Sequence, residues 1–458
     1  RVLRALEMAG ELFRPIFVPD RFREAVGGRA WVQAMLDAES ALAAAEARTA
    51  LIPGEAAEVI ASRCDASLFD PEEIGEGGRA AGNPVPPLVR ALTAAVSEVS
   101  EDAARYVHKG TTSQDIIDTA AMLVAKRALT LILTDADGIA AACARLAEAH
   151  RDTLMAGRTL LQQALPTTFG LKAAGWLVSV LEARRRLLDV RSARLAVQLG
   201  GAAGTLASLG RFGPSVLEQF ARELDLAEPA LPWHSDRTRI SELGDALSLL
   251  AGVFAKISRD VILLSQTEVG EVAEPAGEGR GGSSTLPHKR NPILSVTAAA
   301  SAHRVQDLSQ TLGAAMVGEH ERAVGAWHSE WETLSDALAL TGGVAAAVRE
   351  VVEGLQVHPE KMRENLDMTG GLLLAENVTT LAAERLGRLK AHDIVQAVAR
   401  RVTDNGKPFR EELLAEPALR EVLSPEDIDA ALDPAGYLGS AGAFVDRALT
   451  LYRKEVRV

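Results

Sequence analysis

Seven apolar residues between positions 243 and 264 alternate four and three residues apart. They are Leu243, Leu247, Leu250, Phe254, Ile257, Val261 and Leu264. This heptad spacing places them along one side of a single helix, as a seam that packs against other helices. A helix over residues 241–268 would be about 40 Å long at about 1.5 Å per residue. One small domain does not cover that length, so the seam predicts a bundle of long helices and packing between subunits.

The remaining sequence also favours helix. The chain has 458 residues, enough for two or three domains, and only 4% of them are aromatic, whereas alanine and leucine are abundant. Apolar spacing predicts helices over residues 30–48, 55–63, 116–133 and 293–316, and one more that ends near residue 199. Pro15 and Pro19 are expected to prevent an early helix. No segment shows the alternation of a strand, so an all-α fold is predicted.

Composition excludes several classes of function. The net charge of -13, with no basic tail or stripe, argues against nucleic acid as a partner. No apolar run reaches transmembrane length, so no membrane association is expected. Cys64 and Cys143 give no disulfide framework, which favours a cytoplasmic setting. No residue spacing matches a metal site, and the glycine pattern at 277–282 follows a helix where a dinucleotide site needs a strand. No cofactor or metal is therefore expected.

Residues 282–292, Gly-Ser-Ser-Thr-Leu-Pro-His-Lys-Arg-Asn-Pro, form the most specific motif. Glycines at 279, 281 and 282 precede the serines and give the segment conformational freedom. Ser283 and Ser284 are the only candidate nucleophiles or bases in it, and Lys289 is one of the cations beside them.

Two more polar stretches, residues 107–115 and 157–170, each precede a helical pattern, and a polar-aromatic cluster occupies residues 320–331. In the first stretch, Thr112 or Ser113 can cap the helix that follows. A helix N-terminus also binds carboxylates through its free N–H groups. The two interpretations are compatible.

These motifs resemble the fumarase/aspartase superfamily. Residues 282–292 match its signature at every fixed position, and the three polar stretches follow the order and spacing of its three signature regions. The resemblance extends from about Leu12 to the C-terminus. It implies an all-α, three-domain fold with a long central helical bundle. The expected domains are residues 1–110, residues 111–355 with the signature loop 277–292, and residues 356–458.

The resemblance also implies a homotetramer whose active sites are shared between subunits, acting on a small di- or tricarboxylate. Ser283 would be the catalytic serine, and His108 would donate the proton in its place or only position the substrate. The implied substrate-binding residues are Thr112, Ser113, Arg158, Thr159, Gln162, Ser284, Lys289, Asn291 and Arg322.

One departure from the family pattern narrows the expected chemistry. Adenylosuccinate and argininosuccinate lyases carry Gly-Arg-Thr-His in the second region, where this chain has Leu160 after Thr159. Leucine cannot protonate a leaving group, but a carboxylate leaving group needs no proton, because its conjugate acid has a pKa of about 4. Residues 82–87, 158–163 and 320–328 resemble the bacterial 3-carboxymuconate cycloisomerases. The expected reaction is therefore the interconversion of 3-carboxy-cis,cis-muconate and its lactone, in the protocatechuate branch of the β-ketoadipate pathway.

Two alternatives remain open. One is a fumarate-releasing lyase of the same superfamily, resembling nitrosuccinate lyase or adenylosuccinate lyase. The other is a catalytically silent helical scaffold like some eye-lens crystallins of this superfamily, although the intact Ser283 argues against it.

Overall fold

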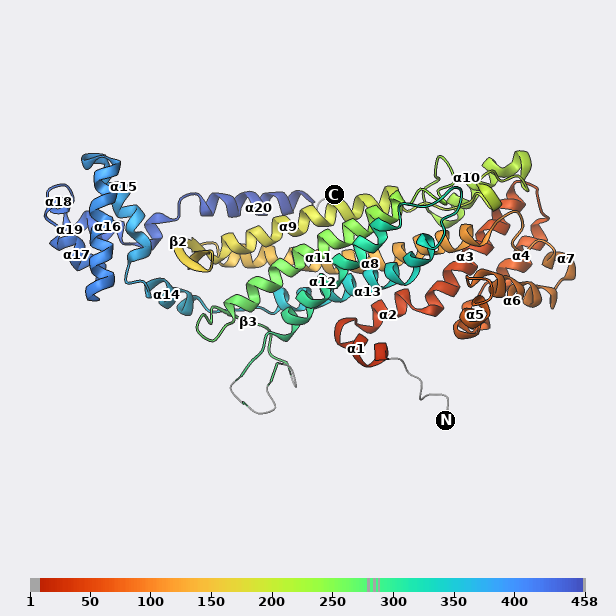
Figure 1. Cartoon of the computed structure of the whole chain (residues 1–458), viewed down its shortest axis with the longest axis horizontal. Helices are drawn as coiled ribbons and strands as arrows, with labels where there is room; N and C mark the ends of the chain where they lie inside the picture. The colour runs from red at the N-terminus through yellow and green to blue at the C-terminus, as the bar shows by residue number, and fades with distance from the viewer. Residues whose placement is uncertain (1–8, 278–280, 283–285, 287–288, 456–458) are drawn as a thin grey trace. The chain divides into compact units, whose positions relative to one another are not determined.

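The computed structural model describes residues 9–277, 281–282, 286 and 289–455, which form helices and two small antiparallel sheets (Figure 1). The α-helices of the first 264 residues are α1 (Ala9–Phe17), α2 (Asp20–Val26), α3 (Gly28–Arg48), α4 (Gly54–Arg63), α5 (Pro71–Gly78), α6 (Val85–Ser97), α7 (Glu101–Ala104), α8 (Ser113–Ala149), α9 (Phe169–Asp189), α10 (Gly213–Leu224) and α11 (Thr238–Leu264). Those that follow are α12 (Ile293–Ala314), α13 (Ala326–Glu353), α14 (Pro359–Asp367), α15 (Ala375–Leu386), α16 (Arg388–Asn405), α17 (Phe409–Ala415), α18 (Pro417–Arg420), α19 (Pro425–Ala431) and α20 (Ala441–Glu455). The strands are β1 (Leu154–Thr159), β2 (Gln162–Thr168), β3 (Val272–Ala273) and β4 (Gln356–Val357).

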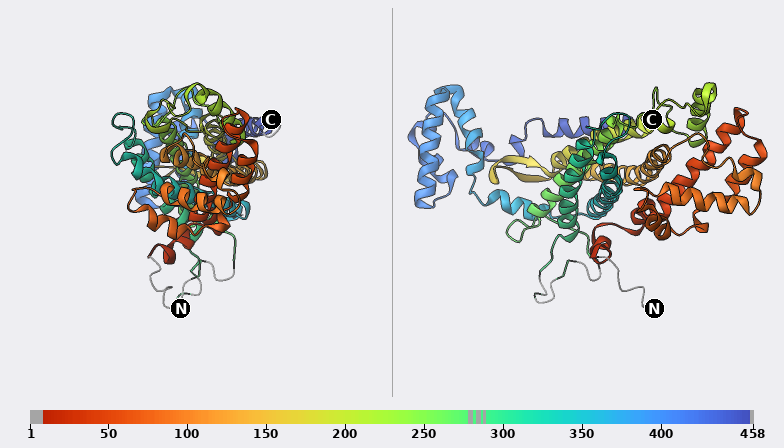
Figure 2. Two further views of the ribbon diagram at one scale, coloured as in Figure 1. Left: turned by 90° about the vertical axis from the view of Figure 1, so that its right-hand side faces the viewer. Right: turned by 45° about the vertical axis from the view of Figure 1, so that its right-hand side comes forward.

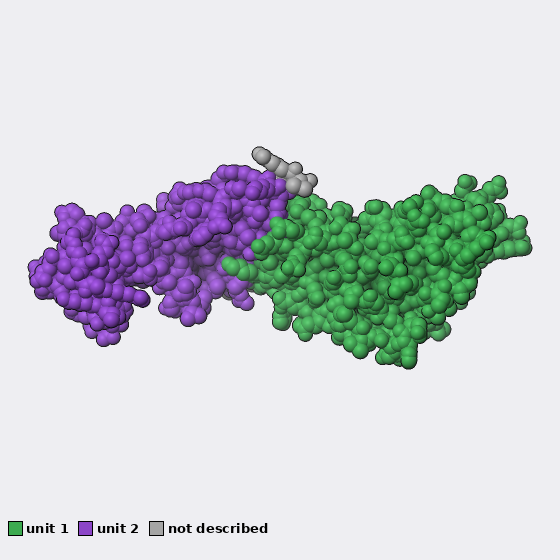
Figure 3. All heavy atoms as spheres, turned by 90° about the horizontal axis from the view of Figure 1, so that it is seen from above, with its two compact units in different colours: residues 1–137, 182–256, 296–348 green, residues 138–181, 257–295, 349–458 purple. Residues whose placement is uncertain are grey.

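The chain divides into two compact units (Figure 3). Unit 1 comprises residues 1–137, 182–256 and 296–348, and unit 2 comprises residues 138–181, 257–295 and 349–458. The three-domain boundaries expected from the sequence stay a prediction.

The heptad seam is confirmed as part of the core. It lies on the 27-residue helix α11, and all seven of its side chains are buried. Burying each such side chain stabilises the fold by about 1.5–3 kcal/mol. Burial of the seam therefore stabilises a helix of this length. Within unit 1, segments of α8, α11, α12 and α13 run side by side (Figures 1 and 2).

Shorter helices complete unit 1. Helix α3 packs against α4 and α10, and α6 packs against α5 and α7. The buried face of α3 includes Leu36 and Leu42, and Leu88 of α6 is also inaccessible. That face also carries two buried glutamates, Glu39 and Glu46.

In unit 2, β1 and β2 form an antiparallel hairpin in which Leu154 pairs with Thr168 and Thr159 with Gln162. Strand β1 also packs against α14, and β3 pairs with β4. Helices α15–α19 surround a separate apolar cluster that includes Val395, Phe409 and Leu413. Figure 2 shows the hairpin and these helices from a second direction.

Most predicted helices are confirmed, and three expectations were wrong. Residues 157–170, which were predicted as a polar loop, contain most of the hairpin. The hairpin was not predicted because apolar and polar residues alternate irregularly along this segment. Helix α1 forms despite Pro15, which lies inside it. The helix predicted to end near residue 199 is shorter: α9 ends at Asp189 and is followed by one π turn, Val190–Arg194. In the part of the chain that the structure describes, no helix combines the length and apolarity needed to span a membrane.

Candidate active site

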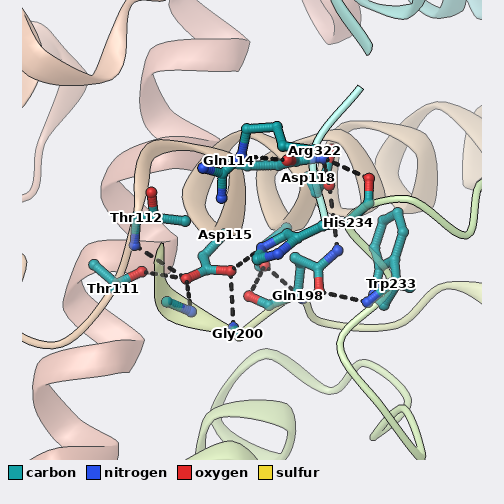
Figure 4. Close-up of polar contacts among 12 residues, drawn as sticks. Thr111, Thr112, Gln114, Asp115, Asp118, Gln198, Gly200, Trp233, His234 and Arg322 are labelled. Carbon is teal, nitrogen blue, oxygen red and sulfur yellow. Dashed lines mark hydrogen bonds and ion pairs between the residues drawn. The ribbon is translucent and has the colours of Figure 1, made fainter. Parts of the chain in front are cut away.

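The N-terminus of α8 is held by a carboxylate from its own first turn. Asp115 Oδ2 accepts a hydrogen bond from the main-chain N–H of Thr112 at 3.0 Å and another from the hydroxyl of Thr111 at 3.1 Å (Figure 4). A negative charge at this end of a helix also interacts favourably with the helix dipole. Asp115 therefore satisfies the main-chain N–H of the residue that precedes α8, as the third-position carboxylate of a capping box does.

Asp115 also joins two other segments of unit 1 to this helix end. Its Oδ1 accepts from the main-chain N–H of Gly200 at 2.9 Å, and its Oδ2 accepts from that of Gly201 at the same distance. His234 Nε2 lies 2.6 Å from Oδ1. Only glycine fits at position 200, because a Cβ atom there would lie 2.8 Å from the His234 ring. The buried carboxylate of Asp115 thus links three segments, namely residues 111–112, residues 200–201 and the loop that carries His234.

Gln114, the neighbour of Asp115, orients the predicted arginine. Its Nε2 donates to the carbonyl oxygen of His234 at 2.9 Å, and its Oε1 accepts from Arg322 Nε at 2.9 Å (Figure 4). Arg322 Nη2 is buried and has no hydrogen-bond partner among the described residues. Leaving a buried guanidinium donor unpaired is unfavourable, so this nitrogen is available to a carboxylate ligand.

A fully buried ion-pair network lies one helical turn further along. Arg237 contacts both carboxylate oxygens of Asp118, at 2.8 and 3.0 Å, and also pairs with Glu330. The indole N–H of Trp327 donates to Asp118 at 3.0 Å. These groups satisfy one another, so the network supports the loops around Gln114 rather than offering a free binding group.

His108 lies on the segment that leads into the N-terminus of α8, five residues before Ser113. Its Nδ1 lies 2.6 Å from Oε1 of the buried Glu39 on α3. Burial lowers the pKa of His108, but the hydrogen bond to Glu39 and the charges of Glu39 and Asp115 outweigh it, so the pKa is raised overall. The imidazole is thus biased toward its cationic form.

In unit 2, the hairpin carries three predicted binding residues in different settings. Arg158 makes a two-pronged contact with the buried Glu271, at 3.0 and 2.7 Å, so its charge already has a partner. Thr159 and Gln162 face each other at the exposed end of the hairpin. Between them, Leu160 and Leu161 form a two-residue turn with φ values of 50° and 66°. Leu160 is 96% exposed.

The signature loop is described only in part, and Ser283 and Ser284 lie outside the described residues. At its base, the main-chain N–H and the side-chain amide of Asn291 both donate to the carbonyl oxygen of Gly281, at 2.8 and 3.2 Å. Gly282 forms an isolated bridge with Arg290, and Lys289 is exposed. Asn291 therefore links the two ends of the signature loop through its hydrogen bonds to Gly281.

The structure brings together four predicted residues in unit 1, namely His108, Thr112, Ser113 and Arg322. The others that the structure describes lie in unit 2: Arg158, Thr159 and Gln162 on the hairpin, and Lys289 and Asn291 at the base of the signature loop. Sequence reasoning missed four groups that organise the first set, which are Glu39, Gln114, Asp115 and His234. The run Gln114-Asp115 directly after Ser113 was a usable signal, whereas Glu39 lies in an ordinary helical pattern.

A separate cavity of about 770 Å³ lies beside α3 and α13, with Trp31, Met35 and Trp331 in its walls. None of the predicted site residues lines it. Over the described residues, no three His, Cys, Asp or Glu side chains are grouped so that they could hold a metal ion.

The chain is similar to known families and proteins over most of its length. A family model described as Lyase matches residues 18–306, and another described as Adenylosuccinate lyase C-terminus matches residues 371–448. The 3-carboxy-cis,cis-muconate cycloisomerase of Bradyrhizobium diazoefficiens is 47% identical over 96% of this chain and 97% of that protein. The nitrosuccinate lyase of Streptomyces davaonensis is 44% identical over 96% of this chain and 94% of that protein. The crystal structure of 3-carboxy-cis,cis-muconate lactonizing enzyme from Pseudomonas putida aligns with a TM-score of 0.92 at 41% identity, covering 97% of this chain and all of that one.

Proposed function

Because the chain belongs to the lyase family of the fumarase/aspartase superfamily, we propose that it interconverts 3-carboxy-cis,cis-muconate and its carboxymuconolactone. In the lactonising direction, a carboxylate of the substrate adds to an alkene carbon and a proton is delivered to the neighbouring carbon. In the opposite direction that proton is removed, the C–O bond breaks and the carboxylate leaves.

The observation that carries this proposal is the high identity of the chain to cycloisomerases over nearly its whole length, and Leu160 at the hairpin tip is compatible with it. Among relatives of this chain, two cycloisomerases are 46–47% identical to it over 96% of its length. An aliphatic side chain cannot donate a proton, and a departing carboxylate requires none at neutral pH. The residue at position 160 and the chemistry of lactone opening are therefore compatible.

Seven of the predicted residues have the following roles in the proposed reaction. Thr112 and Ser113, at the N-terminus of the 37-residue helix α8, bind one substrate carboxylate together with the unpaired Nη2 of Arg322. Lys289 and Asn291 hold another part of the substrate. Ser283 delivers the proton to carbon and removes it in reverse, with Ser284 beside it. These groups stabilise the negative charge that develops on the substrate during proton transfer.

Assembly and setting are part of the same proposal. We place the chain in the cytoplasm as a homotetramer of the β-ketoadipate pathway, with active sites that combine regions of different subunits. The distribution of the predicted residues between two units of the chain motivates this arrangement, as do exposed apolar side chains along long helices, such as Leu249 and Val296.

A second candidate is nitrosuccinate elimination. The 44% identity to a nitrosuccinate lyase motivates it. This reaction also expels a group that is stable as an anion, so Leu160 is equally compatible with it.

The two candidates are separated by steady-state kinetics with product identification. The purified chain is assayed with 3-carboxy-cis,cis-muconate, nitrosuccinate and adenylosuccinate, and lactone or fumarate is quantified. We expect kcat/KM for the muconate to exceed the other two values by at least a hundredfold. A larger value for nitrosuccinate would replace the proposal with the second candidate.

A further inference from the structure

Glu39 is a carboxylate in an unusual place. It lies in the middle of α3, 2% exposed, among apolar side chains of the unit 1 core. The titratable side chain that it contacts is His108, whose Nδ1 lies 2.6 Å from Oε1 of Glu39. A carboxylate removed from water is strongly unfavourable unless a cation or several hydrogen bonds compensate for it. The fold thus retains a buried charge whose partner is a residue of the candidate site.

His108 is held in a fixed orientation by its backbone as well. Its φ of 58° lies in the left-handed region, which is uncommon for residues other than glycine. Gly110, two residues later, also has a positive φ and packs so closely that a Cβ atom there would lie 2.2 Å from Leu209. This tight turn leads directly into Thr112 and α8. The Glu39 contact is one of the interactions that hold it.

We propose that Glu39 is a positioning residue: it accepts the Nδ1–H of His108, keeps the imidazole cationic and leaves Nε2–H as the donor to a substrate carboxylate. With Nδ1 engaged, Nε2 is the ring nitrogen that remains for another partner. The ion pair itself stands on the geometry of unit 1, whereas its role toward substrate rests on the proposed function.

Neighbouring charges are compatible with this arrangement. Asp115, at the start of α8, adds a second negative charge that favours the cation. Glu46, on the same helix face as Glu39, has its pKa raised to about 8 by burial and so is largely neutral at pH 7. Lys109 donates to the carbonyl oxygen of Leu51 at 3.4 Å and lies over the Tyr106 ring. Glu39 is therefore the charged group in direct contact with His108.

The ion pair is tested without any substrate. In the full-length protein with isotope-labelled histidine, the His108 resonance is identified by its loss in His108→Gln and titrated by NMR. We expect Glu39→Gln, which keeps the size and a hydrogen-bond acceptor, to shift the titration to lower pH. Glu46→Gln, the same change at another buried position of α3, should leave it in place. If Glu39→Gln fails to fold, Glu39→Asp should give a smaller shift in the same direction. An unchanged titration in the variant that folds would overturn the ion pair.

The role toward substrate is tested by the pH dependence of kcat/KM. In the wild type we expect kcat/KM to fall as His108 loses its proton at high pH, and this limb should move to lower pH in Glu39→Gln, with a loss of roughly tenfold or more at pH 8. A shifted NMR titration with an unmoved rate profile would overturn this role. If the protein turns over none of the three substrates, the proposed function fails, and the NMR titration still decides the ion pair.

Discussion

Residue-scale effects are clearest at Glu46, a buried carboxyl group without a compensating partner. Neither of its oxygens has a hydrogen-bond partner among the described residues. Burial raises its pKa from 4.5 to about 8, a shift that Lys109 opposes and Glu39 increases. The folded chain therefore keeps this proton over a pH range in which the unfolded chain has released it. Its contribution to the free energy of unfolding falls as the pH rises from about 4.5 toward about 8, and is constant above that range.

Glu46→Gln should remove this dependence. A neutral amide needs no proton, so we expect the variant to lose less stability than the wild type between pH 6 and pH 8. Over these two pH units the difference in lost stability is up to about 3 kcal/mol, since each unit corresponds to about 1.4 kcal/mol. Urea unfolding at the two pH values measures it, with the exposed Glu58→Gln as control. Equal pH dependence in wild type and Glu46→Gln would show that Glu46 is ionised in the folded chain.

Leu160→His should not increase muconate cycloisomerisation. The leaving group is a carboxylate, so an added imidazole has nothing to protonate. The substitution buries no imidazole, because Leu160 is 96% exposed, and histidine is found more often than leucine at positive φ. We therefore expect unchanged stability, no gain in kcat and no cleavage of adenylosuccinate. A clear rise in lactone formation would contradict the account of this position.

Ser283→Ala should lower kcat by at least roughly a hundredfold, because general acid–base groups typically contribute that much or more. Its neighbours are glycine and polar residues, so circular dichroism and thermal unfolding should remain as in the wild type. Near-native kcat in this variant would assign the proton transfer to another group, and His108 and Ser284 would be the next to test.

At the scale of elements, the tight packing of the loops around Asp115 makes Gly200 sensitive. A Cβ atom at this position would lie 2.8 Å from both His234 Cε1 and Pro232 Cβ, so the loop must move away from Asp115. We expect Gly200→Ala to cost about 1–3 kcal/mol of stability and to raise KM through the displaced helix end. Gly75→Ala is the matched control. That glycine lies exposed in α5 with open space around its Cβ position, so the variant should be as stable as the wild type or more stable. Equal stability of the two variants would contradict the steric account.

Sequence patterns predicted the long elements well and the tertiary polar contacts poorly. The seam on α11 repeats over 22 residues, so its direction toward the core follows from spacing alone. The hairpin at β1 and β2 was missed because apolar and polar residues do not alternate regularly along either strand, and because its turn, Leu160-Leu161, lacks the glycine or asparagine that usually marks one. His234 and Glu39 reach the site from positions 119 and 69 residues away from their partners, and no local pattern indicates such contacts.

At the scale of the whole molecule, we expect a tetramer whose activity does not depend on a metal ion. The motivation is the seam together with predicted site residues that occupy separate units of the chain. Light scattering should give four times the chain mass of 48.5 kDa. Activity should survive dialysis against a chelator. A stable, fully active monomer would contradict the shared site, and activity restored by a divalent ion would contradict the metal-free mechanism.

The most direct test of the central claim is NMR analysis of the reaction of 3-carboxy-cis,cis-muconate in D₂O. Addition of the carboxylate with proton delivery to carbon predicts loss of the diene and formation of a lactone. The lactone should carry one deuterium at the carbon next to the new C–O bond. This result should appear with the wild type and not with Ser283→Ala. An unchanged diene, under conditions in which the same preparation releases fumarate from nitrosuccinate, would contradict the account.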